Sequence, residues 1–239
     1  MSTTFYDSLA PHFREYADRR RAYLDAVDEL VAEGIRGRTL LDVGSGDGVR
    51  IQRIARRTGI EQLTLCEPSA EMRRLSSRAE WLPCSRVLDM RAEDLDALEG
   101  SFANVTCLWN VLGHVESRND RIRSLQSMAR LLARGGTLQF DVNNRYNIRA
   151  YGWRLVARNR LDDWLHPERS NGERPVEIAV GGTIVRGRGY LFNPREMDAM
   201  LTEAGLRVIR SVAVDYRTGQ TRATRYEGQL FYQVARKGE

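Results

Sequence analysis

Short apolar runs alternate with longer amphipathic runs from residue 39 to the end of the chain. Each short run has the length and composition of a buried strand, and the stretches between them place apolar residues at helical spacing. Repeated strand–helix units of this length predict a doubly wound α/β domain, with a mostly parallel sheet covered on both faces. The predicted strands are 39–43, 62–66, 86–90, 104–109, 137–142, 206–215 and 229–236, and a further extended run is predicted at 183–192.

Helical patterns precede and separate these strands. The clearest start is Asn193-Pro194-Arg195-Glu196, which combines an N-cap, a proline at the first helical position and a glutamate at the third. The predicted helices are 5–34, 47–57, one opened by Ser69, 118–133 ending at Gly135-Gly136, and one from Pro194 to Gly205. Residues 143–182 break this rhythm, because they are too polar for a core and too aromatic for a linker.

Composition limits the class of protein. With 239 residues, 42% of them hydrophobic, the chain is long enough for one domain, 1–239, with a single well-formed core. No apolar run approaches the length of a membrane span, and the N-terminus lacks a signal-peptide pattern, so we expect a cytoplasmic protein without a membrane partner. Cys66, Cys84 and Cys107 lack metal-ligand spacing, which predicts free thiols and no bound metal.

The net charge of +5 and the isoelectric point near 9.4 raise the question of a nucleic-acid partner. Nearly all the positive charge is arginine, with one lysine at 237, and the arginines are spread among many acids. The one triple, 19–21, begins a helical run whose other face is apolar. A dispersed pattern of this kind indicates a solvated surface rather than a binding patch, so we expect no nucleic-acid partner.

Residues 40–48, Leu-Leu-Asp-Val-Gly-Ser-Gly-Asp-Gly, contain the most informative motif. A strand that turns into a helix through three glycines lets backbone approach a ligand closely and presents unpaired helix N–H groups to it. The third glycine of a dinucleotide fingerprint would fall at Val49, which disfavours NAD. An acid two positions before Gly-x-Gly-x-Gly resembles motif I of the class I S-adenosylmethionine (SAM)-dependent methyltransferases.

The resemblance extends in element order from residue 39 to the C-terminus. It implies a seven-stranded sheet in the order 3-2-1-4-5-7-6 with the last strand antiparallel, preceded here by an N-terminal helical extension. It also implies SAM as cofactor and S-adenosylhomocysteine as product. A bare tight turn without any ligand is the alternative interpretation of motif I alone.

The resemblance also assigns candidate cofactor residues. Glu67, at the end of the second strand, corresponds to the acid that binds both ribose hydroxyls of SAM. The loop 90–95 resembles the adenine-binding loop, although Arg91 stands where many relatives have aspartate, so Glu93, Asp94 or the Ala92 backbone would take that part. The full cofactor set implied is Asp42, Gly44, Ser45, Gly46, Gly48, Glu67, Pro68, Met72, Ala92, Glu93 and Asn110.

His114 follows the fourth strand, in the segment that in this family runs beneath the methionine moiety towards the substrate. An imidazole has an ordinary pKa near working pH, so His114 is the candidate general base. A packing or hydrogen-bonding role is the alternative, and His12 and His166 are other candidate bases. The chain lacks the Asn/Asp-Pro-Pro-Tyr/Phe tetrad that signals methylation of exocyclic amines in nucleic acids.

Substrate contacts are predicted where the fifth strand ends, since α/β ligand sites form at the carboxyl edge of the sheet. Asn143, Arg145 and Tyr146 lie there, with a polar loop that caps the next helix as the alternative interpretation. Residues 1–37 and 143–192 are expected to form a cover over this edge, with Tyr16 and Tyr190 as further substrate contacts. The predicted function is methyl transfer from SAM to an oxygen or nitrogen of a small molecule, in biosynthesis; a homodimer is compatible with the sequence.

Two other functions remain open from the sequence. One is an RNA methyltransferase, suggested only by the charge. The other is a regulatory protein that binds SAM without transferring its methyl group. An RNA-binding module is absent from the sequence pattern and motif I is intact, so both alternatives rank below the small-molecule enzyme.

Overall fold

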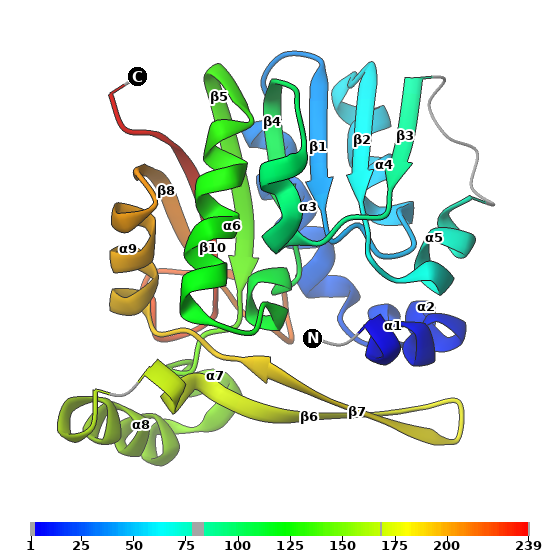
Figure 1. Ribbon diagram of the computed structural model, residues 1–239. Coiled ribbons are helices and arrows are strands. Elements are labelled where there is room, and N and C mark those ends of the chain that lie inside the picture. Colours follow the sequence, from blue (N-terminus) through cyan, green and yellow to red (C-terminus); the bar gives the residue numbers. More distant parts are fainter. Residues whose placement is uncertain (1–2, 78–83, 168, 239) are drawn as a thin grey trace.

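The computed structural model describes residues 3–77, 84–167 and 169–238. Its main sheet contains eight strands, ordered β3-β2-β1-β4-β5-β10-β8-β9 (Figure 1). The strands are β1 Thr39–Val43, β2 Gln62–Cys66, β3 Cys84–Leu88, β4 Phe102–Cys107, β5 Leu132–Val142, β8 Leu206–Val214, β9 Thr221–Arg222 and β10 Gln229–Arg236.

The predicted strand order and direction are confirmed. Strands β1 to β5 run parallel, and β10 is antiparallel to both β5 and β8. The two-residue β9 at the edge is the one addition to the predicted seven strands. All parallel strands therefore end at one edge of the sheet, where a ligand site is expected.

Side chains that alternate along the strands build two separate cores. Leu40 packs with helices α3 (Arg21–Gly34) and α4 (Val49–Thr58) on one face, and Leu41 packs with α6 (Arg118–Arg130) and α9 (Pro194–Glu203) on the other. Because every second residue of a strand points the same way, two adjacent leucines serve both faces. Cys66 and Cys107 are buried free cysteines within the strands, as predicted.

The N-terminal segment is not the single helix predicted over 5–34. It consists of α1 (Thr3–Leu9), a 3₁₀ turn (Ala10–His12), α2 (Phe13–Asp18) and α3. Pro11 has no N–H to donate and its ring disfavours the helical conformation of the preceding residue, so the chain turns there. The break directs α1 and α2 beneath the carboxyl edge of the sheet (Figure 1).

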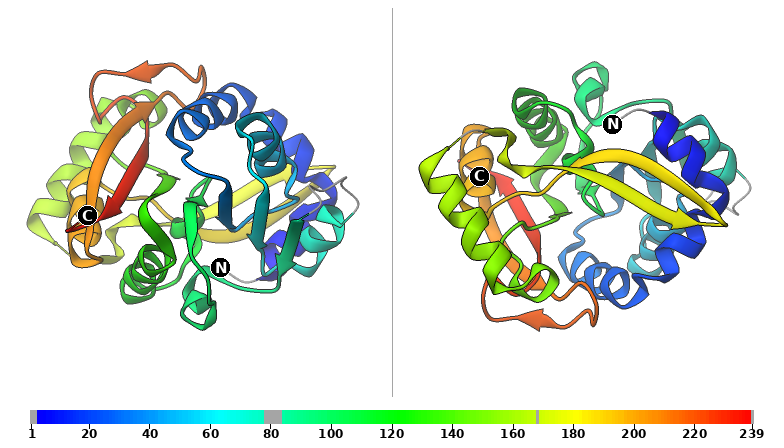
Figure 2. Two further views of the ribbon diagram at one scale, coloured as in Figure 1. Left: turned by 90° about the horizontal axis from the view of Figure 1, so that it is seen from above. Right: turned by 90° about the horizontal axis from the view of Figure 1, so that it is seen from below.

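The stretch after β5 is also more regular than predicted. It contains α7 (Ile148–Tyr151), α8 (Trp153–Leu165), a 3₁₀ turn (Arg169–Gly172) and an antiparallel hairpin of β6 (Glu173–Val180) and β7 (Thr183–Tyr190). Gly181 and Gly182 form its two-residue turn with φ of +53° and +75°, values that glycine adopts without strain. Viewed from below, the hairpin crosses the carboxyl edge of the main sheet (Figure 2).

Helix α1 and the hairpin share a small core of their own. Phe5 and Leu9 pack against Ile178, Val180 and Val185. Gly187 lies directly beneath the Phe5 ring, where a Cβ would come within 2.6 Å of it. Two segments that are far apart in the chain thus form one unit that lies next to the ends of the parallel strands.

Two boundaries differ from prediction around Gly135-Gly136. Helix α6 ends at Arg130 and β5 begins at Leu132, so these glycines lie inside a strand rather than ending a helix. A Cβ on Gly136 would lie 3.0 Å from the carbonyl oxygen of Ala103 on β4. The pairing of β4 with β5 changes register nearby, between Phe102 and Asn104. Glycine is therefore required for close strand approach. Remaining helix bounds are α5 Ala70–Ser76 and the 3₁₀ turns Ala92–Ala97 and Val111–His114.

Candidate active site

The glycine loop between β1 and α4 adopts a conformation that only glycine takes without strain. Gly44, Gly46 and Gly48 have φ of +76°, +57° and +71°. The Gly44 N–H donates to the Cys66 carbonyl oxygen at 2.8 Å, which fixes the loop against the end of β2. The loop therefore presents bare backbone to the space beyond the strand ends.

Glu67 follows β2 and faces this loop. Its Oε2 accepts the Gly46 N–H at 2.7 Å, and its Oε1 accepts the Ser69 N–H at 2.9 Å. Burial raises the pKa of Glu67 to about 7, although both N–H donors favour the carboxylate. Each carboxylate oxygen has two lone pairs, so Glu67 retains capacity to accept hydrogen bonds from a ligand.

Asp42 is held at the end of β1 by a neighbouring strand. Its Oδ1 accepts the Thr106 hydroxyl at 2.6 Å, and burial raises its pKa to about 6. Nearby, Arg14 of α2 donates to the Asp47 carboxylate of the glycine loop at 3.3 Å. This ion pair joins the N-terminal helices to the loop.

Two adjacent hollows border the glycine loop, and Phe13 of α2 lines both. The first holds about 90 Å³ and the second about 290 Å³. Predicted cofactor residues that line the first are Gly44, Gly46, Glu67, Pro68, Ala92 and Glu93, and those that line the second are Asp42, Gly44, Ser45 and Gly46. Gly48, Met72 and Asn110 line neither: Gly48 is the N-cap of α4, and Met72 is fully buried in α5.

A third, inner cavity of about 80 Å³ lies between α1, α2, the hairpin and the strand ends. It shares Tyr6, Phe13, Trp109 and His114 with the first hollow. The Tyr16 ring stacks on Trp109, with centroids 5.0 Å apart and planes 13° apart. Of the predicted substrate residues, Tyr16, Asn143 and Tyr190 line this cavity, as do Asn110 and His114.

The turn after β4 has an uncommon backbone. Trp109 and Asn110 have φ of +63° and +61°, although neither is glycine. The Trp109 N–H donates to Asp141 Oδ1 at 2.6 Å, and Asn110 Oδ1 accepts the Asn143 N–H at 2.9 Å. Strain held by such a network is typical of functional sites. The turn places the Trp109 indole where it lines both cofactor hollows and the inner cavity.

His114 is half-buried between α1 and β7. Its ring packs edge to face on Tyr6, with centroids 5.5 Å apart. Burial lowers the pKa of His114 to about 4, and a hydrogen bond to the Arg188 backbone opposes this shift. The imidazole is therefore neutral near pH 7, which is the form that accepts a proton but with weak basicity.

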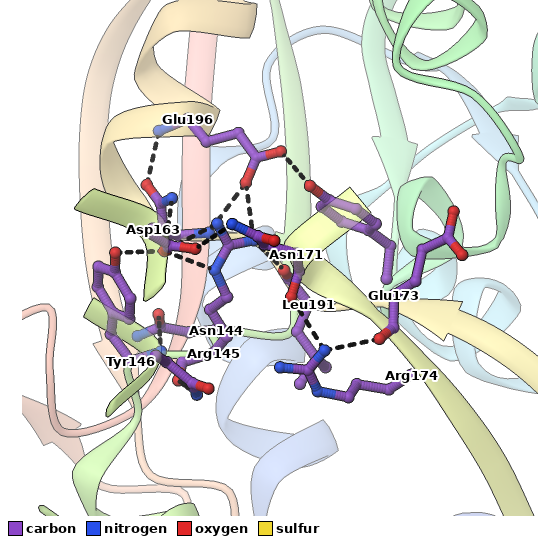
Figure 3. A network of polar contacts seen from close by, with 12 residues as sticks. Asn144, Arg145, Tyr146, Asp163, Asn171, Glu173, Arg174, Leu191 and Glu196 are labelled. Atoms are coloured by element: carbon purple, nitrogen blue, oxygen red, sulfur yellow. Dashed lines mark hydrogen bonds and ion pairs between the residues drawn. The ribbon is translucent and has the colours of Figure 1, made fainter. Parts of the chain in front are cut away.

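Arg145 and Tyr146 do not line the inner cavity, and their role as substrate contacts stays a prediction. Arg145 is buried and forms ion pairs with Asp163 of α8 at 2.9 Å and with Glu196 of α9 at 3.2 Å (Figure 3). The Tyr146 hydroxyl donates to Asp163, and the Tyr190 hydroxyl donates to Glu196. This network joins the helices of the inserted stretch to α9 and to the hairpin. Arg145 and Tyr146 border a separate outer groove.

Sequence reasoning missed several lining residues. Phe13, Trp109 and Val111 line the cofactor hollows, together with Ser69, Asp47 and Arg14. The strained turn at 109–110 leaves no local signal in an otherwise apolar strand end. Within residues 3–77, 84–167 and 169–238, no group of three or more His, Cys, Asp or Glu side chains is arranged to hold a metal ion. Over the same ranges, no helix has the length and apolarity needed to cross a membrane.

The sheet order, the three-glycine loop after β1 and the acid after β2 together define a class I methyltransferase domain. The family described as "Methyltransferase domain" matches residues 13–211, and the chain belongs to it. It is a SAM-dependent methyltransferase, in agreement with the resemblance of motif I.

Similar proteins belong to the same class. The chain is 33% identical over 199 residues to the ubiquinone biosynthesis O-methyltransferase of Paracidovorax citrulli, covering 78% of this chain and 79% of that protein. It is 33% identical over 193 residues to the protein of the same name from Alkalilimnicola ehrlichii, covering 75% and 74%. A SAM-dependent methyltransferase from Clostridium acetobutylicum shares the fold, with a TM-score of 0.67 at 15% identity over 95% and 99% of the two chains.

Proposed function

We propose that this enzyme transfers the methyl group of SAM to a hydroxyl group of a small planar acceptor, as a step in a biosynthetic pathway. The observation that carries the proposal is the inner cavity, whose walls are largely aromatic and which adjoins the first cofactor hollow through Tyr6, Phe13, Trp109 and His114. The relatives named as O-methyltransferases of ubiquinone biosynthesis support an oxygen acceptor.

In this proposal the cofactor lies along the glycine loop. Glu67 accepts hydrogen bonds from the ribose hydroxyls, and the segment at Ala92 and Glu93 borders the adenine. Asp42 and the loop glycines border the methionine end, while Asn110 holds the turn beside it. SAM supplies an already activated methyl group, so the protein's task is to orient the acceptor, exclude water and let its proton leave.

The cover must open for the cofactor to enter. Small-molecule sites usually hold about 300–1,000 Å³. Phe13 lines the two cofactor hollows and the inner cavity, and each of the three is smaller than this, so the acceptor also enters only when the cover opens. The Arg14–Asp47 ion pair and the Asp7 carboxylate, which accepts the Ser69 hydroxyl at 2.6 Å, hold α1 and α2 in the closed position. Entry therefore requires α1 and α2 to move away from the glycine loop.

His114 remains the candidate general base. Its pKa of about 4 leaves it unprotonated at neutral pH, yet limits how strongly it draws a proton from a hydroxyl. A neutral imidazole beside Tyr6 also positions an acceptor hydroxyl by accepting its hydrogen bond. His12 and His166 do not line the inner cavity, so His114 is the better placed of the three.

The direct test is turnover. Purified protein is incubated with SAM and a panel of hydroxylated and amine metabolites, and S-adenosylhomocysteine formation is measured. Methylation of a hydroxyl acceptor is the expected result. Transfer to amines only would contradict oxygen specificity. Salt-sensitive transfer to RNA would favour the RNA enzyme, and SAM binding without transfer to any acceptor would favour the regulatory protein.

We also expect SAM affinity to rise with pH. Burial raises the pKa of Glu67 to about 7, so below that pH the carboxyl group is protonated and accepts fewer ribose hydrogen bonds. A site that needs the ionised form of a group with this pKa should bind about tenfold more weakly at about pH 6 than at about pH 8. Calorimetry across this range checks it, and an unchanged dissociation constant would contradict the role given to Glu67.

A further inference from the structure

The inner cavity carries one full positive charge on its wall. Among the described residues that line it, Arg174 of β6 is the charged one. Its Nη1 donates to the carbonyl oxygens of Asn171 at 2.9 Å and Glu173 at 2.7 Å (Figure 3). The Glu173 carboxylate points away from this guanidinium in Figure 3 and pairs with Arg188 instead. In the part of the chain that the structure describes, no carboxylate forms an ion pair with Arg174.

A second arginine approaches from the N-terminal segment. The Arg20 guanidinium lies over the Tyr216 ring, 4.5 Å from its centroid, and Tyr216 lines the inner cavity. The Arg20 Nε is buried and lacks a hydrogen-bond partner among the described residues. Arg20 does not itself line the cavity, but it places a second positive charge against Tyr216, one of the aromatic wall residues.

Two other arginines that follow β5 have carboxylate partners, which Arg174 and Arg20 lack among the described residues. Arg145 pairs with Asp163 and Glu196, and Arg149 pairs with Asp215 at 2.7 Å. A half-buried cation without a counter-charge costs free energy, because it loses hydration without gaining an ionic partner. An anionic ligand group would supply the missing partner.

The remaining wall defines the rest of the ligand. Tyr16 stacked on Trp109, together with Phe5 and Phe13, provides flat apolar surfaces suited to a ring. His114 lies where the cavity meets the first cofactor hollow. The cavity therefore offers cationic groups, aromatic walls and a hydrogen-bond acceptor near the cofactor.

We propose that the acceptor is a hydroxylated aromatic acid whose carboxylate binds Arg174, with Arg20 adding a second positive charge. The ring lies against Tyr16 and Trp109, and the hydroxyl group faces His114 and the methyl donor. This inference rests on the proposed function and adds the substrate class to it. Guanidinium groups bind carboxylates through paired, charge-assisted hydrogen bonds, so the acid is selected over its neutral analogues.

The test compares acids with their esters. Protein loaded with S-adenosylhomocysteine is titrated by calorimetry with hydroxylated benzoates and cinnamates, and with the methyl ester of each. We expect an acid of this panel to bind at least about tenfold more tightly than its ester, the scale of a charge-assisted hydrogen bond. Arg174→Met should remove this preference, leaving the affinities for the ester and for S-adenosylhomocysteine unchanged.

Matched variants separate the charge from general damage to the cover. Arg174→Lys keeps the charge and should retain part of the preference. Arg186→Met removes an exposed arginine of the same hairpin, paired with Glu177, and should retain all of it. Equal binding of acid and ester by the wild type, no binding of any acid, or a preference that survives Arg174→Met would overturn the inference. Failure of the wild type to bind S-adenosylhomocysteine would overturn the proposed function instead.

Discussion

Replacing Glu67 by alanine should weaken SAM binding at least about a hundredfold, the expected effect of removing two charge-assisted hydrogen bonds. Glu67 is the acid that the glycine loop faces, and its two oxygens are already aligned by the Gly46 and Ser69 N–H groups. Alanine removes both the ribose acceptor and the group that holds Gly46 in place. Calorimetry with SAM on the wild type and the variant measures the difference.

Loss of the fold must be separated from loss of the site. Alanine leaves the Gly46 and Ser69 N–H groups without this acceptor, a cost of about 1–3 kcal/mol each, so thermal unfolding is recorded for every variant. Glu67→Gln keeps the size of the side chain, but its amide NH₂ group would face the N–H group of either Gly46 or Ser69, which is also a donor. This variant should therefore also bind SAM poorly. Glu71→Gln, on the same segment and paired with Arg74, is the control. Binding by a folded Glu67→Ala protein within about threefold of the wild type, a difference well under 1.4 kcal/mol, would refute the assignment.

The sheet was predictable because its strands carry a local pattern. Adjacent apolar residues such as Leu40 and Leu41 indicate burial on both faces, which is typical of parallel strands between helices. The boundary at Gly135-Gly136 was mispredicted because glycine at a close strand approach has the same local pattern as glycine at a helix end. The contact that decides between them, with Ala103 of the neighbouring strand, is distant in sequence.

Strand β7 was predicted as an extended run, but its partner β6 was missed for a different reason. Gly181-Gly182 is a two-residue turn signal, but most of the flanking residues are exposed or half-buried. The few buried ones, such as Ile178 and Val185, pack on Phe5 of α1 rather than on the main sheet. Strand β6 alternates apolar residues at Val176, Ile178 and Val180, but Pro175 at its start weakens a strand prediction.

The candidate site was also predictable only in part. Glu67 and the loop glycines follow from a motif and a strand end, and the structure brings them together. The ion pairs of Arg145 leave no local signal, because its partners Asp163 and Glu196 lie 18 and 51 residues further along the chain. Proximity to a strand end identifies a set of candidates, but only the folded structure shows which of their charges are already neutralised.

Replacing Gly44 by alanine should impair both stability and cofactor binding. Gly44 has a φ of +76°, and a Cβ there would lie 2.5 Å from Cγ2 of Val111, which lines the first cofactor hollow. Left-handed strain costs about 1–2 kcal/mol and overpacking about 1–3 kcal/mol, so we expect a loss of about 3 kcal/mol in the free energy of unfolding. Displacement of the loop relative to Glu67 should weaken SAM binding by at least about tenfold, or about 1.4 kcal/mol. Denaturant unfolding and calorimetry measure the two effects.

Gly59→Ala supplies the matched comparison. Gly59, at the other end of α4, has a similar φ of +71°, but a Cβ there would meet no heavy atom within 4 Å. Its substitution carries the backbone strain alone, so it should cost about 1–2 kcal/mol of stability and leave SAM affinity unchanged. Equal stability losses in the two variants would mean that Val111 moves aside freely. Full SAM affinity in Gly44→Ala would mean that the cofactor does not need the close contact between the bare backbone of Gly44 and Val111 beside the first hollow.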